Sequence, residues 1–188
     1  MMARVRARNR RREGATLLQV AVFVSLAGCL VAAFLPTFVR ALRLSKVAEA
    51  SRQLERMHEA SAAYFAAPHE IEGETYRRCL PVATGPFPEE PTREAHAVDF
   101  EGTDLARAGF DAIDFEIEEP IRFSYSMIPT VSGCDLHSPE GTYLVTYRAE
   151  GDLDGDGERS LFERRDHALE GEDVLEPIGI LYIRDRTE

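Results

Sequence analysis

The chain has 188 residues, of which 22 are basic and 33 acidic, so its formal net charge is −11 at pH 7. So acidic a composition argues against nucleic-acid binding and charge-driven adsorption to anionic membranes, and suits cation binding. The first 14 residues hold six arginines and one glutamate, so the remainder carries 16 basic and 32 acidic side chains, a net of −16. Without that segment and one long helix, about 120 residues remain, enough for a single domain with a modest core.

An uncharged segment follows the N-terminal arginines. Ala15 to Val39 are 25 residues without a formal charge. At about 1.5 Å of rise per residue, a helix of this length crosses the roughly 30 Å hydrocarbon core of a bilayer. The preceding positive charges favour a cytoplasmic N-terminus. We therefore expect one membrane span, residues 15–39, with the bulk of the protein beyond it facing away from the cytoplasm.

At the junction between the two segments, the basic segment ends in Gly14, Thr16 is the second residue after it, and Pro36 stands 21 residues after Ala15. This arrangement resembles the N-terminus of type IV pilins and of type II secretion pseudopilins. The resemblance implies cleavage by prepilin peptidase between Gly14 and Ala15, giving a leader (1–14), an N-terminal helix (15–67) and a globular domain (68–188). It implies a structural subunit that crosses the inner membrane once, with its C-terminal domain in the periplasm, and that reaches a filament or the cell surface after assembly. Its partners would be other pilins or pseudopilins and an inner-membrane assembly platform.

One position departs from that family. Gln19 stands where a glutamate usually pairs with the new α-amino group of a neighbouring subunit, so Gln19 offers only an uncharged hydrogen bond there. Some minor pseudopilins at filament tips also lack the glutamate. The departure favours a minor or tip-like subunit, while the choice between pilus and secretion system stays open.

A second interpretation uses the same span. Leu26-Ala-Gly-Cys29 matches the lipobox at which bacterial lipoproteins are cut and acylated. The protein would then be a membrane-anchored periplasmic binding module, either bitopic or acylated at Cys29. The apolar residues that follow Cys29 disfavour this alternative, and it leaves Gly14, Thr16 and Pro36 unexplained.

Helical periodicity continues beyond the span. Apolar or small residues recur at steps of three and four while charges occupy the other faces, which predicts a helix that ends before Pro68. The stripe comprises Leu44, Val47, Ala48, Ser51, Leu54, Met57, Ser61, Tyr64 and Phe65. Pro36 lies between the apolar half and the amphipathic half, where a missing backbone hydrogen bond allows bending.

The segment from Pro68 to Gly109 contains five prolines and reads as a long loop, with a short helix expected at Asp104 to Ala108. Cys79 lies in this loop and Cys134 lies beyond the next strand. In an oxidising compartment they are the expected disulfide, because Cys29 sits in the apolar span.

Four segments alternate in the manner of strands: Ile121 to Met127, Thr142 to Ala149, Ser160 to Arg164, and Gly179 to Ile183. They predict an antiparallel sheet with one face available to the helix. The expected fold class is therefore α+β, with a long N-terminal helix packed on a small antiparallel sheet. Pilin-like domains are similar in form.

The most specific chemical pattern is Asp152 to Glu163, which fits the twelve-position calcium loop. Its predicted ligands are Asp152, Asp154 and Asp156, the backbone carbonyl of Glu158, Ser160 and Glu163, with Gly157 at the sharp turn. Strand-like flanks indicate a connection between strands rather than an EF-hand, and a solvated hairpin turn without metal is the alternative. Major pseudopilins are similar in carrying a structural Ca²⁺ in this region.

Enzyme signatures are missing from the sequence. The five histidines show no zinc-binding spacing, and Gly-x-Ser-x-Gly, Cys-x-x-Cys and phosphate-binding glycine loops do not occur. We expect a structural protein with no catalytic residues.

Overall fold

A computed structural model of the chain describes residues 16–99, 107–134, 142–169 and 171–185. The chain divides into two compact units, the first ending at Leu42 and the second beginning at Arg43. Helix α1 (Leu17–Ala66) belongs to both units by sequence, and an antiparallel sheet lies in the second. The predicted α+β class is therefore confirmed.

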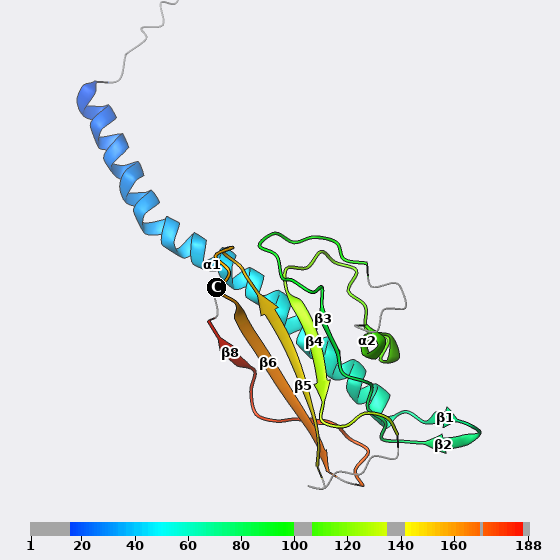
Figure 1. Ribbon diagram of the computed structural model, residues 1–188. Coiled ribbons are helices and arrows are strands. Elements are labelled where there is room, and N and C mark those ends of the chain that lie inside the picture. The colour runs from blue at the N-terminus through cyan, green and yellow to red at the C-terminus, as the bar shows by residue number, and fades with distance from the viewer. Residues whose placement is uncertain (1–15, 100–106, 135–141, 170, 186–188) are drawn as a thin grey trace, which may run out of the picture. The chain divides into compact units, whose positions relative to one another are not determined.

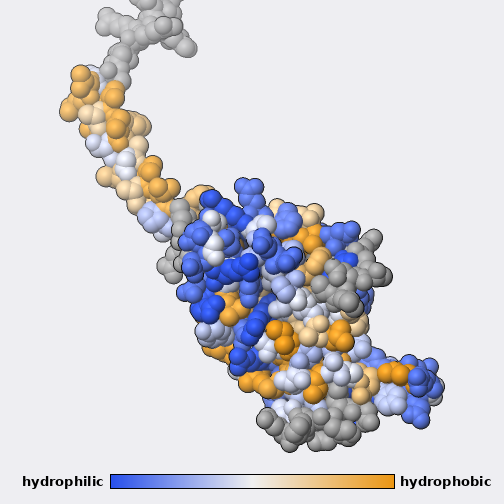
Figure 2. Space-filling view, in the orientation of Figure 1, coloured by the Kyte–Doolittle hydropathy of each residue, from blue (hydrophilic) through white to orange (hydrophobic). Residues whose placement is uncertain are grey.

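The first unit is the apolar part of α1. Residues Leu17–Phe38 are long and apolar enough to cross a membrane, and their side chains are exposed throughout. Figure 2 shows this part of the helix as a largely hydrophobic surface. The helix continues through Pro36, which has no N–H to donate to the carbonyl of Ala32. The hydroxyl of the next residue, Thr37, donates to the carbonyl of Phe34, three residues back, at 2.7 Å.

A six-stranded antiparallel sheet forms the centre of the second unit (Figure 1). Its strands are β3 (Thr84–Phe87), β4 (Ser124–Pro129), β5 (Thr142–Gly151), β6 (Ser160–Leu169), β7 (Glu176–Pro177) and β8 (Tyr182–Arg184). The order is β3-β4-β5-β6-β7, and β8 also pairs with β6. The longest pairing joins β5 and β6 in register from Thr142 opposite Leu169 to Gly151 opposite Ser160.

The amphipathic part of α1 packs on one face of this sheet. Val47, Ala50, Leu54, Met57, Ser61 and Phe65 are buried at steps of three and four, which is one face of a helix. The facing side chains come from alternate positions of β5, namely Tyr143, Val145, Tyr147 and Ala149. Two expected members of the stripe, Ala48 and Ser51, are instead exposed.

The long loop carries more structure than its prolines indicate. It contains a hairpin of β1 (His69–Ile71) and β2 (Glu74–Tyr76), and β3 adds an edge strand to the sheet. Helix α2 (Ala108–Ala112) begins where the predicted helix at Asp104 to Ala108 was to end. That predicted segment lies mostly outside the described residues.

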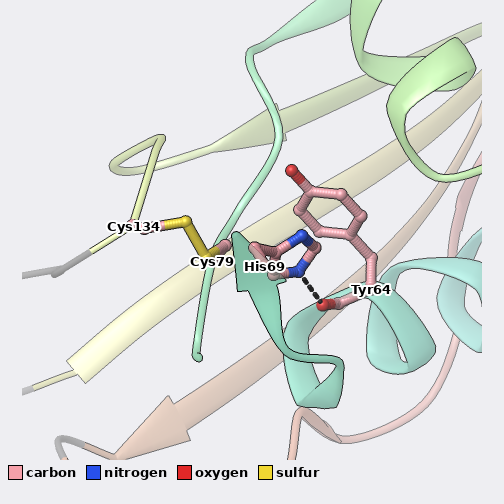
Figure 3. The surroundings of a disulfide bond; sticks show 4 residues. All are labelled: Tyr64, His69, Cys79 and Cys134. Carbon is pink, nitrogen blue, oxygen red and sulfur yellow. Dashed lines mark hydrogen bonds between the residues drawn. A yellow bond between two sulfur atoms is a disulfide. The ribbon is translucent and has the colours of Figure 1, made fainter. Parts of the chain in front are cut away.

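The predicted disulfide between Cys79 and Cys134 is confirmed (Figure 3). Beside it, Leu80 and Gly133 exchange two backbone hydrogen bonds, of 2.9 and 2.7 Å. The bond thus ties the long loop to the segment after β4. Cys29 is a free, exposed cysteine.

Candidate functional site

The predicted metal loop is the connection between β5 and β6. The ladder closes at Gly151 opposite Ser160, and the residues between these two form the turn. Gly151 is needed at the closing pair because a Cβ there would stand 2.5 Å from the Phe123 ring. Three predicted ligands come together in the turn: Asp152, Asp154 and Asp156 each offer a carboxylate oxygen, and these oxygens all lie within 4.8 Å of one another.

Backbone amides hold the three carboxylates in place. Asp152 accepts from the N–H groups of Gly155 at 2.7 Å and Gly157 at 3.2 Å, one on each oxygen. Asp156 accepts from the N–H of Glu158 at 2.8 Å. Both glycines have positive φ angles, 81° and 94°, a conformation that side chains disfavour. The Asp-Gly-Asp-Gly sequence therefore folds the loop back over its own carboxylates.

A lysine from α1 fastens this loop to the domain. The Lys46 ammonium donates to the carbonyl oxygen of Leu153 at 3.1 Å, and the Leu153 side chain is buried in the core. The loop is thus anchored at its second residue, while Asp154 and Asp156 are exposed and Asp152 is partly buried.

The donor set fits a hard cation of the size of Ca²⁺. Ligand distances of about 2.3–2.6 Å place two oxygens on opposite sides of Ca²⁺ at most about 5 Å apart, and the observed oxygens lie within 4.8 Å. Each amide-bonded oxygen retains a lone pair for a metal. Asp152, Asp154 and Asp156 would hold the ion by their side chains and Glu158 by its backbone carbonyl.

Two predicted ligands lie elsewhere. The buried Ser160 hydroxyl donates to the Gly151 carbonyl at 3.0 Å, so it closes the ladder. Glu163 lies within β6 opposite Arg148, three pairs further along the ladder, because the strand carries it away by about 3.3 Å per residue. The predicted twelfth-position ligand, Glu163, is therefore corrected: it pairs with Arg148 across the ladder and is not among the carboxylates that converge in the turn.

Glu163 instead forms a charged group on the other face of the sheet. Arg148 Nε donates to one carboxylate oxygen at 2.8 Å and Arg165 Nε donates to the other at 2.7 Å. Burial by itself raises the pKa of Glu163, but the hydrogen bonds from the two arginines outweigh it, so the pKa is lowered from 4.5. Glu163 is therefore a structural carboxylate with both oxygens already engaged.

Gln19, one of the two residues predicted to act in assembly, lies in the first turn of α1, and the other, Pro36, lies further along the same helix. The Thr16 N–H donates to the Gln19 side-chain oxygen at 3.0 Å, and the Gln19 N–H donates to the Thr16 hydroxyl at 3.3 Å. This reciprocal pair is a capping box, which satisfies two amides that a helix start leaves free. The Thr-x-x-Gln spacing carried this signal in the sequence, where Gln19 was considered only for contact with a neighbouring subunit. Gly14 and Ala15 lie outside the described residues.

Comparison of the chain with protein-family models, with curated proteins and with solved structures finds no match.

Proposed function

We propose that the chain is a structural subunit, minor or tip-like, of a type IV pilus or a type II secretion filament, made as a precursor and cut after Gly14 by prepilin peptidase. The observation that supports the proposal most directly is the two-part character of α1. One helix joins a segment with exposed apolar side chains, Leu17–Phe38, to a segment whose apolar stripe is built into the core of the second unit.

Such a helix suits a subunit that moves from lipid into a filament. The exposed apolar side chains need either lipid or other apolar helices around them. Either surrounding satisfies them, because hydrocarbon tails and apolar helix faces are similarly nonpolar. The folded head carries its own core and disulfide, so it does not require the filament to remain folded.

The capping box supports the proposed cleavage position. Both of its members, Thr16 and Gln19, lie after Gly14, so a chain beginning at Ala15 retains the complete cap. Gln19 then presents an uncharged amide near the new N-terminus, which favours a minor role over that of a major subunit.

Intact-mass spectrometry tests the processing step. The full-length chain is produced in membranes with and without an active prepilin peptidase. We expect a mature chain that begins at Ala15 only when the peptidase is active, and no cut in a Gly14→Lys variant. Gly28→Ala is the matched control, because a Cβ at Gly28 meets nothing within 4 Å. A chain that begins at an acylated Cys29, or one that retains its leader in every case, would refute the proposal in favour of an anchored binding module.

We further propose that the loop of Asp152, Asp154 and Asp156 binds Ca²⁺ in a structural role. The support is the convergence of three carboxylates whose mutual repulsion a divalent cation relieves. The test is calcium titration calorimetry on the full chain in detergent, together with its thermal unfolding. Asp154→Asn and Asp156→Asn should each weaken binding. Glu158→Gln should not, because only its carbonyl is assigned to the ion. An unchanged melting temperature in saturating Ca²⁺ would end this proposal.

A further inference from the structure

A cluster of polar side chains is buried where α1 packs on β5 and β6. Asp166 is fully buried, and its Oδ2 forms a hydrogen bond of 2.6 Å with His58 Nδ1. Arg164, from the same strand, forms an ion pair with Glu55 on α1 through Nη1. Tyr147 of β5 is fully buried beside Asp166 and Ser61. We refer to His58, Tyr147, Arg164 and Asp166 as the Asp166 cluster.

Three polar atoms of this cluster are buried without a hydrogen bond to any described residue. They are Tyr147 Oη, Arg164 Nε and Asp166 Oδ1. Arg164 Nε and Asp166 Oδ1 are 3.6 Å apart, beyond hydrogen-bonding distance. Buried polar groups are almost always paired with protein or with ordered water, so three orphans in one cluster require an explanation.

The chemistry of the three atoms defines what would satisfy them. Arg164 Nε–H is a donor and the Asp166 carboxylate oxygen is an acceptor. Burial, and then the negative charge of Asp166, raise the pKa of Tyr147, so its hydroxyl stays protonated and serves as a second donor. A cation would face the guanidinium, and an anion would face the carboxylate. The complementary ligand is neutral and both donates and accepts.

We infer that the Asp166 cluster binds one buried water molecule between α1 and the sheet. The water accepts from Tyr147 Oη and Arg164 Nε and donates to Asp166 Oδ1, which places it among three polar partners, a usual number for an internal water. It thereby links β5 and β6 through a carboxylate whose other oxygen is held by His58 of α1. The inference does not depend on the proposed filament role.

The competing arrangement has no water. The Tyr147 hydroxyl lies near enough to Ser61 and Asp166 for hydrogen bonding with each to affect its pKa, and a small rotation of the side chain would let it donate directly to either. That arrangement leaves Arg164 Nε without a hydrogen bond, because Asp166 Oδ1, with which it forms an ion pair, lies 3.6 Å away. The bridging water satisfies all three atoms, which is why we favour it.

A high-resolution crystal structure of the full chain in detergent decides between the two. We expect a solvent peak about 2.7–3.2 Å from each of Tyr147 Oη, Arg164 Nε and Asp166 Oδ1. Direct contact of Tyr147 Oη with Asp166 or Ser61, with no such peak, would overturn the inference. In a Tyr147→Phe variant the peak should persist against Arg164 and Asp166, because only one of its three partners is removed. Loss of the peak in that variant, with Arg164 closing onto Asp166, would show that the two side chains need no bridge.

Discussion

Leu54→Ala tests whether the amphipathic half of α1 is part of the folded core. Leu54 is fully buried at the middle of the stripe, between Ala50 and Met57. Truncation removes buried carbons and leaves a cavity, so we expect the free energy of unfolding to fall by about 3 kcal/mol, within the range for buried leucines. Alanine has the higher helix propensity, so a weaker helix cannot account for a loss.

The assay is denaturant unfolding of the full chain in detergent micelles, followed by near-ultraviolet circular dichroism of the six tyrosines. The matched control is Leu26→Ala, which makes the same change in the same helix at a residue that is 62% exposed. We expect that control to change stability by less than about 0.5 kcal/mol. Leu54→Met, which keeps most of the volume, should cost less than about 1.5 kcal/mol.

The test depends on comparing the stability loss of Leu54→Ala with that of Leu26→Ala. If Leu54→Ala costs no more than Leu26→Ala, the amphipathic half of α1 is not packed on the sheet. The core described above would then be mistaken. A change in the denaturant slope rather than in the midpoint would show a changed unfolded or native state, which is a different effect from a lost contact.

Other perturbations test separate parts of the second unit. Replacing Cys79 and Cys134 by serine opens a loop between residues 55 apart and should cost about 4 kcal/mol by the chain-entropy relation, measured by denaturant unfolding; an equal stability of the reduced and oxidised chains would contradict this. Gly109→Ala should cost about 1–3 kcal/mol, because its Cβ would stand 2.3 Å from the Val82 carbonyl oxygen, and an unchanged melting temperature would count against that packing. Glu163 has a lowered pKa, so its ion pairs stabilise the fold above about pH 4.5 and this contribution disappears as the pH falls through the lowered value. The stability difference between the unmodified chain and Glu163→Gln should therefore shrink in acid, and a difference independent of pH would refute the role assigned to Arg148.

The long helix and the central strands were predictable because their signals are repetitive. Steps of three and four from Val47 to Phe65 predicted a helix ending before Pro68, and α1 ends at Ala66. Alternation predicted the core of β5, which the structure extends to Gly151. Periodicity of this kind survives local irregularity, because many residues contribute to it.

The short elements were not predictable in the same way. Strand β3 contains Pro86 and pairs with β4 only through a register shift, so no alternation marks it in the sequence. The hairpin of β1 and β2 turns at Glu72 and Gly73, both with positive φ, in a segment of mostly polar residues. Such elements are set by the tertiary contacts of the domain more than by local pattern.

Within the twelve residues of the metal loop, one part of the prediction agrees with the structure and another part does not. Its three aspartates come together because they lie in one tight turn, where spacing along the chain fixes spacing in three dimensions. Glu163 does not join them, because it lies three residues into the extended strand β6, where it pairs with Arg148. A linear motif thus located the turn residues correctly and misjudged the residue beyond the turn.

The cap at the beginning of α1 has a consequence for how the helix tolerates being shortened. Thr16 and Gln19 satisfy one another's backbone amides, and neither relies on a residue that precedes them. Both of these hydrogen bonds lie wholly within the segment that begins at Thr16. A protease that removed the arginine-rich segment before Thr16 would therefore leave a helix whose N-terminal cap is intact. Its first turn would not need to refold before the helix packs against another chain.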